Sequence, residues 1–223
     1  MKVCILQSNF LPWRGYFDLI RESDLFIIYD DVQYTKGDWR NRNRIKTPLG
    51  TRWITVPVHH RLGQSIEVTP VDYSAPWAER MLNRVRESYS RAPRFEPYFS
   101  ELGALLAPPA ASISELNLRL ITWACRHLGI GTPLRMSREY RAAGAKTERL
   151  VGILRQVGAT RYLSGPAARA YLEPERFERA GIALEYKEYR YREYDQLYPP
   201  FDPAVSVIDL LFMHGPEARS YLE

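Results

Sequence analysis

The sequence predicts an α/β fold with a mostly parallel, Rossmann-like sheet, flanking helices, an antiparallel hairpin insertion and a helix-rich C-terminal half. Residues 2–7 and 25–29 are almost continuously apolar, as strands buried on both faces of a sheet are. Residues 15–21 are expected to form a helix between them, which completes a βαβ unit. After residue 113 helical and strand patterns alternate, as they do in parallel sheets with crossover helices.

The rest of the N-terminal half is expected to form a loop, a hairpin and a helix. Residues 36–46 are interpreted as a basic loop. Residues 52–58 and 65–71 are expected to be two strands, joined by a long tip at residues 59–64. A helix is expected over residues 76–89, because its first residue is a proline and proline is favoured at a helix start.

Residues 102–112 contain two adjacent prolines and form the expected seam between two halves of the chain. We therefore expect an N-terminal half, residues 1–105, and a C-terminal half, residues 113–223, packed together as one compact unit. The first helix of the C-terminal half has apolar residues every four positions, and Gly129 follows as a stop signal. The further expected elements are strands at 133–136, 161–163 and 182–186 and helices at 147–157, from 166 onward and at 206–213.

The composition is that of a soluble globular protein, with 223 residues, of which 45% are hydrophobic and 26% charged. A chain of this length buries about 70% of its unfolded surface, so it needs no disulfide or metal ion to fold. The two cysteines, Cys4 and Cys125, form no CxxC pair, and we expect reduced thiols in a cytoplasmic protein. No window approaches 18 successive apolar residues, so no membrane span is predicted.

Positive charge is concentrated in one window of the chain. Residues 36–61 contain seven basic residues and one acidic residue, so they carry +6 while the rest of the chain sums to −1. One interpretation is a solvated basic loop. The other is a patch for an anionic group, because the planar fork of arginine matches two phosphate oxygens. No recognised nucleic-acid module is present, so nucleic acid is not the expected partner. The substrate-binding candidates in this window are Lys36, Arg40, Asn41 and Arg42.

Polar side chains follow the first predicted strand. Gln7 and Asn9 come at its end, and Tyr16 lies at the start of the expected helix. Ligands of open α/β sheets collect at this edge, and the free N–H groups of a helix start favour anions. These three residues are therefore substrate-binding candidates. The alternative is a tight turn in which the aromatic residues only pack.

A second polar segment follows the second predicted strand. Asp30 and Asp31 are catalytic candidates, because a carboxylate there can act as a general base or accept hydrogen bonds from sugar hydroxyls. Gln33 and Tyr34 come directly after them and are substrate-binding candidates. In the alternative, a carboxylate pairs with the basic loop that follows. No pair of histidines, or of a histidine and a carboxylate, has the spacing of metal ligands, so no metal site is predicted.

The remaining candidates lie further along the chain. His59 and His60 are catalytic candidates at the hairpin tip, because an imidazole titrates near neutral pH; the alternative is an exposed tip without chemistry. Ser164 precedes a helix start that can hold an anion, although it can equally be a helix N-cap. Tyr194 and Gln196 belong to an aromatic run that can stack on a sugar or a base, or form a half-buried edge strand.

Several stretches carry a family resemblance. In chain order they are ILQSNFLPWRGYFDLI, DLFIIYDDVQYTKGDWRNRNRIKT, WITVPV, GATRYLSG, YREYDQ and FDPAVSVIDLLF. With these motifs the chain resembles the WbqC-like family over nearly its full length. The resemblance implies a bacterial protein encoded among genes for O-antigen, other surface polysaccharides or natural products. It also implies a transfer step on a sugar or amino-acid intermediate, but it brings no cofactor and no set of catalytic residues.

Two hypotheses follow for the function. The first is a transferase without a covalent nucleophile, which moves an acyl or aminoacyl unit onto an amino-bearing small molecule. Its donor is expected to be a carrier-protein phosphopantetheine thioester or a nucleotide-linked compound, and an acidic carrier protein would suit the basic loop. The second is a non-catalytic scaffold that docks an acidic partner or a phosphate-bearing ligand through that loop. The first hypothesis expects one cleft walled by Gln7, Asn9, Tyr16, Asp30, Gln33 and Arg40, with Ser164 on the far wall and His59 as a lid.

Overall fold

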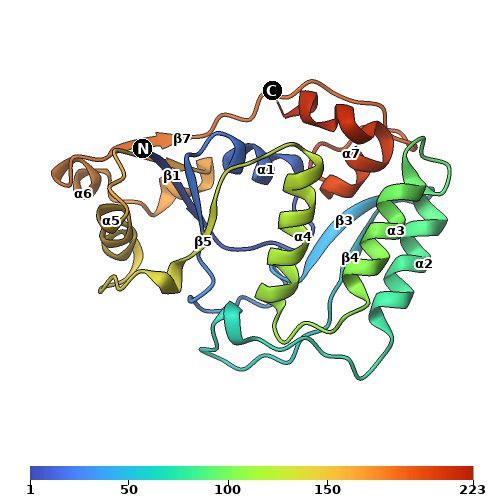
Figure 1. Cartoon of the computed structure of the whole chain (residues 1–223), viewed down its shortest axis with the longest axis horizontal. Helices are drawn as coiled ribbons and strands as arrows, with labels where there is room; N and C mark the ends of the chain where they lie inside the picture. The colour runs from blue at the N-terminus through green and yellow to red at the C-terminus, as the bar shows by residue number, and fades with distance from the viewer. Residues whose placement is uncertain (223) are drawn as a thin grey trace.

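The computed structural model describes residues 1–222 (Figure 1). Its centre is a five-stranded sheet in the order β5-β2-β1-β6-β7. The strands are β1 (Lys2–Leu6), β2 (Leu25–Ile28), β5 (Leu134–Met136), β6 (Arg161–Ser164) and β7 (Ala183–Tyr186). All of the neighbouring strands in this sheet pair in parallel. The predicted α/β fold with a mostly parallel sheet is therefore confirmed.

The side chains of the central strands alternate between two apolar cores, one on each face of the sheet. The helices that cover these faces are α1 (Arg14–Arg21), α4 (Ile113–His127), α5 (Lys146–Gln156) and α6 (Pro174–Arg179). Cys4 and Phe26 belong to the core that contains α1 and α4, whereas Val3 and Ile27 belong to the core that contains α5 and α6. Figure 1 shows the two pairs of helices on opposite sides of the sheet.

In chain order, strands are added first on one side of the central strand β1 and then on its other side. Helix α1 connects β1 to β2 on one side, and α5 connects β5 to β6 on the other side of β1. The strand order therefore reverses between β1 and β6, with the two crossover helices on opposite faces. In open α/β sheets, ligands bind outside the carboxyl ends of the strands at such a switch point.

A separate two-stranded sheet confirms the predicted antiparallel insertion, but it lies earlier in the chain than expected. The hairpin consists of β3 (Arg42–Thr47) and β4 (Gly50–Thr55). The expected pairing of residues 52–58 with residues 65–71 is wrong. The second of these segments contains a 3₁₀ turn, η1 (Ile66–Val68), and meets the first only at one isolated bridge.

The basic segment is a strand from Arg42 onward rather than a loop. Asn43 and Ile45 are buried while Arg42 and Arg44 are half-buried, which is the period of two that a strand requires. The basic side chains mask this alternation in the sequence. Gly50 closes the turn between the strands with a φ of 86°, a conformation that favours glycine.

Three further helices pack with α4 and the hairpin (Figure 1). They are α2 (Trp77–Tyr89), α3 (Phe95–Leu106) and α7 (Val207–His214), and the shorter 3₁₀ helices are η2 (Ser137–Glu139), η3 (Pro166–Ala170) and η4 (Gly215–Tyr221). The seam expected at residues 102–112 is helical in its first part, because Leu102 and Leu106 are buried in the helical layer. Strands from both sides of this seam join one sheet. Among residues 1–222, no helix has the length and apolar character that a membrane crossing requires.

Candidate functional site

A cleft of about 400 Å³ opens at the carboxyl edge of the parallel sheet, at the switch point beside β1. Gln7 directly follows β1 and Tyr29 directly follows β2, so both lie where ligands of open sheets bind. Further side chains come from the start of α5 and from the turn after η3. The cleft is lined by Ile5, Leu6, Gln7, Tyr29, Val32, Lys146, Leu150, Tyr162 and Tyr171.

The polar groups of this cleft are mainly hydrogen-bond donors. Burial raises the pKa of Tyr29, and the Arg149 guanidinium, whose Cζ lies 5.2 Å from the centroid of that ring, offsets part of the rise. Tyr171, which is 63% exposed, adds a second hydroxyl to the lining. Both hydroxyls therefore stay protonated at neutral pH and can donate to a carbonyl or anionic oxygen. Lys146 adds a cationic donor to the same cleft.

Lys146 has an unusual backbone conformation. Its φ is 50°, and the other non-glycine residue with a positive φ among residues 1–222 is Leu11, with a φ of 42°. Such conformations cost about 1–3 kcal/mol and concentrate at binding sites. Lys146 is also the first residue of α5, whose first N–H groups have no partner within the helix. The start of α5 therefore brings a cation to the cleft, and the free N–H groups lie at the same end of the helix.

Asp31 is held beside the cleft by an ion pair and a hydrogen bond. It forms an ion pair with Arg149 Nη2, and its other oxygen accepts a hydrogen bond from Ser137 Oγ at 2.6 Å. The same arginine contacts Tyr29, so the carboxylate, the guanidinium and the phenol form one connected group. This predicted catalytic candidate thus lies next to the cleft, although its charge is engaged.

Asp30, the neighbouring candidate, has no exposure to solvent. Its Oδ1 accepts a hydrogen bond from the Ser8 backbone N–H at 2.8 Å. Its Oδ2 accepts one from Ser114 Oγ, on α4, at 2.5 Å. Both carboxylate oxygens are therefore engaged, and Asp30 ties the segment after β1, residues 7–13, to α4. We call this segment the first loop.

Buried side chains from three other positions hold the first loop as well. Arg40 Nη1 donates to the Ser8 carbonyl at 3.1 Å, and Asn117 Nδ2 donates to Ser8 Oγ at 3.0 Å. Asn43 Nδ2 donates to the Leu11 carbonyl at 2.8 Å. The predicted anion contact Arg40 is thus part of the support of the loop, and the positive φ of Leu11 is fixed by this network.

Gln7 and Asn9, which were expected in a single cleft, line two different hollows. Gln7 lines the cleft described above, whereas Asn9 lines a smaller pocket together with Trp13 and Trp39, which we call the tryptophan pocket. Tyr16 is buried, and its hydroxyl donates to the Gln7 carbonyl at 3.2 Å, so it supports the backbone of the first loop. The expected single cleft is therefore divided by the first loop.

The other residues that were predicted to bind an anion differ in how far their side chains are already bonded within the protein. Arg42 donates from Nη2 to a backbone carbonyl of its own segment, and its Cζ lies 4.3 Å from the centroid of the Trp53 ring. Asn41 is buried and donates from Nδ2 to the Val56 carbonyl at 2.7 Å. Lys36 is exposed. None of them lines the cleft.

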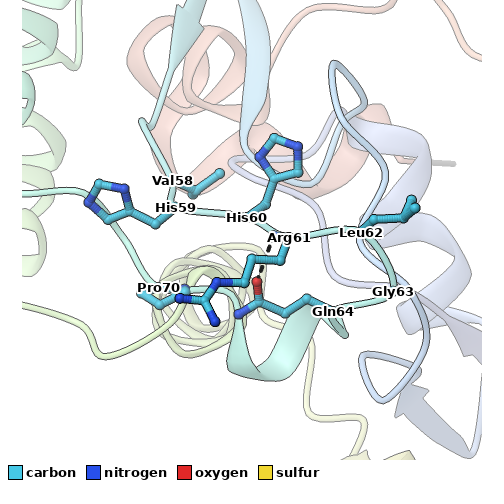
Figure 2. A pocket seen from close by; sticks show the side chains of 8 residues that line it. All are labelled: Val58, His59, His60, Arg61, Leu62, Gly63, Gln64 and Pro70. Carbon is cyan, nitrogen blue, oxygen red and sulfur yellow. Dashed lines mark hydrogen bonds between the residues drawn. The ribbon is translucent and has the colours of Figure 1, made fainter.

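His59 and His60 lie at the exposed tip, away from the cleft lining (Figure 2). Figure 2 shows their imidazoles pointing in different directions. His59 Nε2 lies 3.3 Å from Asp72 Oδ1, and the His60 ring centroid lies 5.4 Å from that of the buried Tyr34. The tip and Pro70 surround an open hollow of about 900 Å³.

The remaining substrate-binding candidates lie outside the cleft lining. Gln33 is exposed, while Ser164 and Tyr194 are buried. Gln196 Nε2 donates to the Tyr194 hydroxyl at 3.2 Å, so this pair is satisfied within the C-terminal segment. Among residues 1–222, no group of three or more potential metal ligands gathers at one place.

Sequence reasoning did not identify Tyr29, Lys146, Arg149 or Tyr171. Tyr29 closes a predicted strand, so extending the strand-end rule back by one residue would have found it. Lys146 and Arg149 come from α5, in the crossover from β5 to β6, and Tyr171 follows η3, in the connection from β6 to β7. No local motif marks them.

Comparison with known proteins places the whole of this architecture in one family. A model of the WbqC-like protein family matches residues 7–221. A protein of Mycobacterium tuberculosis (strain ATCC 25618 / H37Rv), "Uncharacterized protein Rv1507c", is 48% identical over 229 residues, which cover 99% of this chain and 97% of the relative. No solved structure gives a significant match. The matched range includes the first loop, α5 and the exposed tip.

Proposed function

Because the chain belongs to the WbqC-like protein family, we propose that it is a group transferase in surface-polysaccharide (O-antigen) or natural-product biosynthesis. In this proposal it moves an acyl or aminoacyl unit onto the amino group of a small molecule. The observation that carries the proposal is the cleft at the carboxyl edge of the sheet, whose volume of about 400 Å³ suits such a molecule. Its donors favour substrates that carry carbonyl and anionic oxygens.

The donor in this proposal is a carrier-protein phosphopantetheine thioester or a nucleotide-linked compound. Lys146 and the first N–H groups of α5 bind its anionic part, because a helix start favours negative charge. The Tyr29 hydroxyl and the Gln7 amide donate to the carbonyl oxygen, on which negative charge develops as the amine attacks. These roles use groups that line the same cleft.

The acceptor amine attacks the carbonyl carbon directly, and the thiolate or phosphate of the donor leaves. A thiol intermediate is not part of the proposal, because burial raises the pKa of Cys4 and raises that of Cys125 to about 12. The proton that the amine loses passes through water to the leaving thiolate or phosphate, and Asp31, bonded by Arg149 and Ser137, holds the guanidinium beside Tyr29.

The test is a transfer assay read by mass spectrometry. The purified protein is mixed with acetyl-coenzyme A or a glycyl-phosphopantetheine thioester, and with a nucleotide-linked amino sugar as acceptor. We expect N-acylated product, and we expect Tyr29→Phe to lower its rate at least about tenfold, because one oxyanion donor is lost. Arg190→Ala, at an exposed position away from the cleft lining, serves as the control and should leave the rate unchanged. Absence of product with these donors, or equal rates for Tyr29→Phe and wild type, would contradict the proposal.

A non-catalytic docking module is the second candidate, and the exposed tip favours it. Leu62 is 96% exposed there and follows Arg61, so the tip offers an apolar side chain beside a cation. Under this alternative an acidic carrier protein binds the wild type and loses binding to Leu62→Asp. The same alternative expects Tyr29→Phe to change nothing that can be measured.

A further inference from the structure

The tryptophan pocket has the size and the walls of a site for one flat ring. Its volume is about 180 Å³, and its lining consists of Asn9, Trp13, Trp39, Asn43 and Ala204. An apolar cavity of about 150 Å³ is large enough to hold benzene, so this pocket can hold a single ring. The two indoles offer faces or edges against which an aromatic ring can pack.

Asn9 brings an unused amide to this pocket. Its Oδ1 is shielded from solvent and has no hydrogen-bond partner among residues 1–222, and its Nδ2 makes no hydrogen bond to them either. Because Oδ1 is shielded, a ligand in the pocket does not reach it, whereas Nδ2 is accessible and can donate to an acceptor on the ligand. The amide of Asn43, by contrast, is used on both sides, because Nδ2 donates to the Leu11 carbonyl and Oδ1 accepts from the Arg44 N–H.

The position of Trp13 depends on a glycine. A Cβ atom at Gly15 would lie 2.2 Å from Cζ2 of the Trp13 ring, so any larger residue there displaces the indole. The first loop that carries Asn9 and Trp13 is held by the buried network around Asp30. The walls of the pocket are therefore fixed before a ligand arrives, which lowers the entropy cost of binding.

We infer that the tryptophan pocket is a nucleobase site, in which the ring packs against Trp13 and Trp39 and an acceptor atom on its edge accepts a hydrogen bond from Asn9 Nδ2. Every nucleobase carries a ring nitrogen or a carbonyl oxygen on its edge that can accept from this donor while the ring lies between the indoles. A sugar ring can also pack on indoles, but it is puckered and its hydroxyls do not lie in one plane with the ring. The inference does not rest on the proposed transfer reaction, because it concerns binding alone.

A nucleotide in this pocket would have a cation within reach of its phosphate. The Trp39 ring centroid lies 5.3 Å from that of Trp53, and the Arg42 guanidinium lies 4.3 Å from the centroid of Trp53. Trp39 is 37% exposed, so this wall of the pocket reaches the surface. In the inferred complex the ribose and the phosphate leave along this wall, toward the basic strand β3.

The test compares the four common nucleoside 5′-monophosphates with ribose 5-phosphate and methyl glucoside. Titration calorimetry should give a Kd below about 1 mM for at least one of the nucleotides and no measurable binding for the two compounds without a base. Saturation-transfer NMR should show stronger transfer to the base protons than to the ribose protons. Asn9→Leu and Trp39→Ala should each raise the Kd about tenfold, since each removes one part of the recognition.

Asn83→Leu, at an exposed position on α2, is the matched control and should leave the Kd unchanged. Melting curves establish that each variant is folded. If Asn9→Leu does not fold, Trp39→Ala alone decides, because its indole is partly exposed and is not needed for the core. Equal binding of ribose 5-phosphate, binding of methyl glucoside instead of the nucleotides, no binding of any nucleotide, or unchanged Kd values in the folded variants would overturn the inference.

Discussion

The first loop and the exposed tip both follow strands and both carry polar side chains, but they are held in different ways. In the first loop, a single residue, Ser8, forms hydrogen bonds with the buried side chains of Asp30, Arg40 and Asn117. In the tip, the hydrogen bonds at Arg61 are local, from its N–H to Gln64 Oε1 at 2.9 Å and from the Gln64 N–H to its carbonyl at 3.1 Å.

This difference bears on where chemistry can be positioned. A binding or catalytic group must be held within about 0.5 Å of its working geometry, and buried hydrogen bonds supply that restraint. The first loop meets this requirement, and three of its residues line hollows: Gln7 the cleft, and Asn9 and Trp13 the tryptophan pocket. The tip has exposed side chains, apart from the half-buried Gln64, and its bonds to Tyr34 and Pro70 involve backbone groups, so we assign no reaction step to its side chains.

The largest expected effect comes from removing the main anchor of the first loop. Asp30→Ala leaves the Ser8 N–H and the Ser114 hydroxyl buried without their acceptor. Each such group costs about 1–3 kcal/mol, so we expect a loss of about 3 kcal/mol or more in the free energy of unfolding. Urea denaturation measures this loss directly. Asp72→Ala, at a half-buried carboxylate beside the tip that accepts from the Ser74 N–H, is the comparison and should cost clearly less. Similar losses for the two variants would remove the contrast between the two regions.

Asp209 shows what burial without hydrogen bonds does to the protonation of an aspartate. Asp209, on α7, is as buried as Asp30, but neither of its carboxylate oxygens has a hydrogen-bond partner among residues 1–222. Burial raises its pKa to about 8, although Lys46 opposes the rise. In the unfolded chain the pKa is near 4. The folded protein therefore holds a proton that the unfolded chain has lost between about pH 4 and pH 8, and stability falls as the pH rises through this range.

Asp209→Asn removes this titration and keeps the shape of the side chain. We expect the variant to be more stable than wild type at pH 8, by on the order of a few kcal/mol, and the difference to vanish toward pH 4. Chemical denaturation of both proteins at several pH values measures the difference. A constant difference over the whole range would mean that Asp209 stays ionised in the folded protein.

A smaller effect is expected at the end of the first loop. Gly15→Ala places a methyl group 2.2 Å from the present position of Trp13 Cζ2, so the indole must move. Overpacking of this kind costs about 1–3 kcal/mol, and replacing glycine by alanine in a helix returns about 0.5–1 kcal/mol. We expect a net loss of about 1 kcal/mol, visible as a fall of about 2–4 °C in the melting temperature. Gly103→Ala, in α3, where a Cβ atom would be 3.9 Å from its nearest neighbour, is the control and should not be destabilised. An unchanged melting temperature for Gly15→Ala would show that Trp13 is not fixed by the glycine.

Most of the fold follows from local patterns in the sequence. The apolar strands β1 and β2 and the capped helices are recognisable without the structure, because burial on both faces and helix end signals are local properties. The hairpin was misplaced because Lys46 is buried and Arg44 half-buried in β3, where an apolar alternation is the usual signal. Long basic side chains can cover apolar surface with their methylene stems, so they can occupy such positions.

The site was harder to predict than the fold. Asp30 and Arg40 have residue types and positions that fit catalysis, but a polar side chain that is fully engaged inside the protein looks the same in a sequence as one that faces a ligand. The groups that line the cleft, such as Lys146 and Tyr171, come from a segment more than a hundred residues after β1. The connections on either side of β6 bring them to the edge of the sheet, and no local motif in the sequence indicates that they lie beside β1.

The smallest expected effect is that of His59→Ala. His59 Nε2 lies 3.3 Å from Asp72 Oδ1, but the side chain is 69% exposed, so the ion pair contributes less than about 1 kcal/mol to stability. Melting curves should therefore coincide with wild type. The rate in the transfer assay should change less than about twofold, because the cleft lining does not include this residue. A tenfold loss of rate with an unchanged melting temperature would show that the tip reaches the cleft when substrate is bound, and it would return the imidazole to the mechanism as a base.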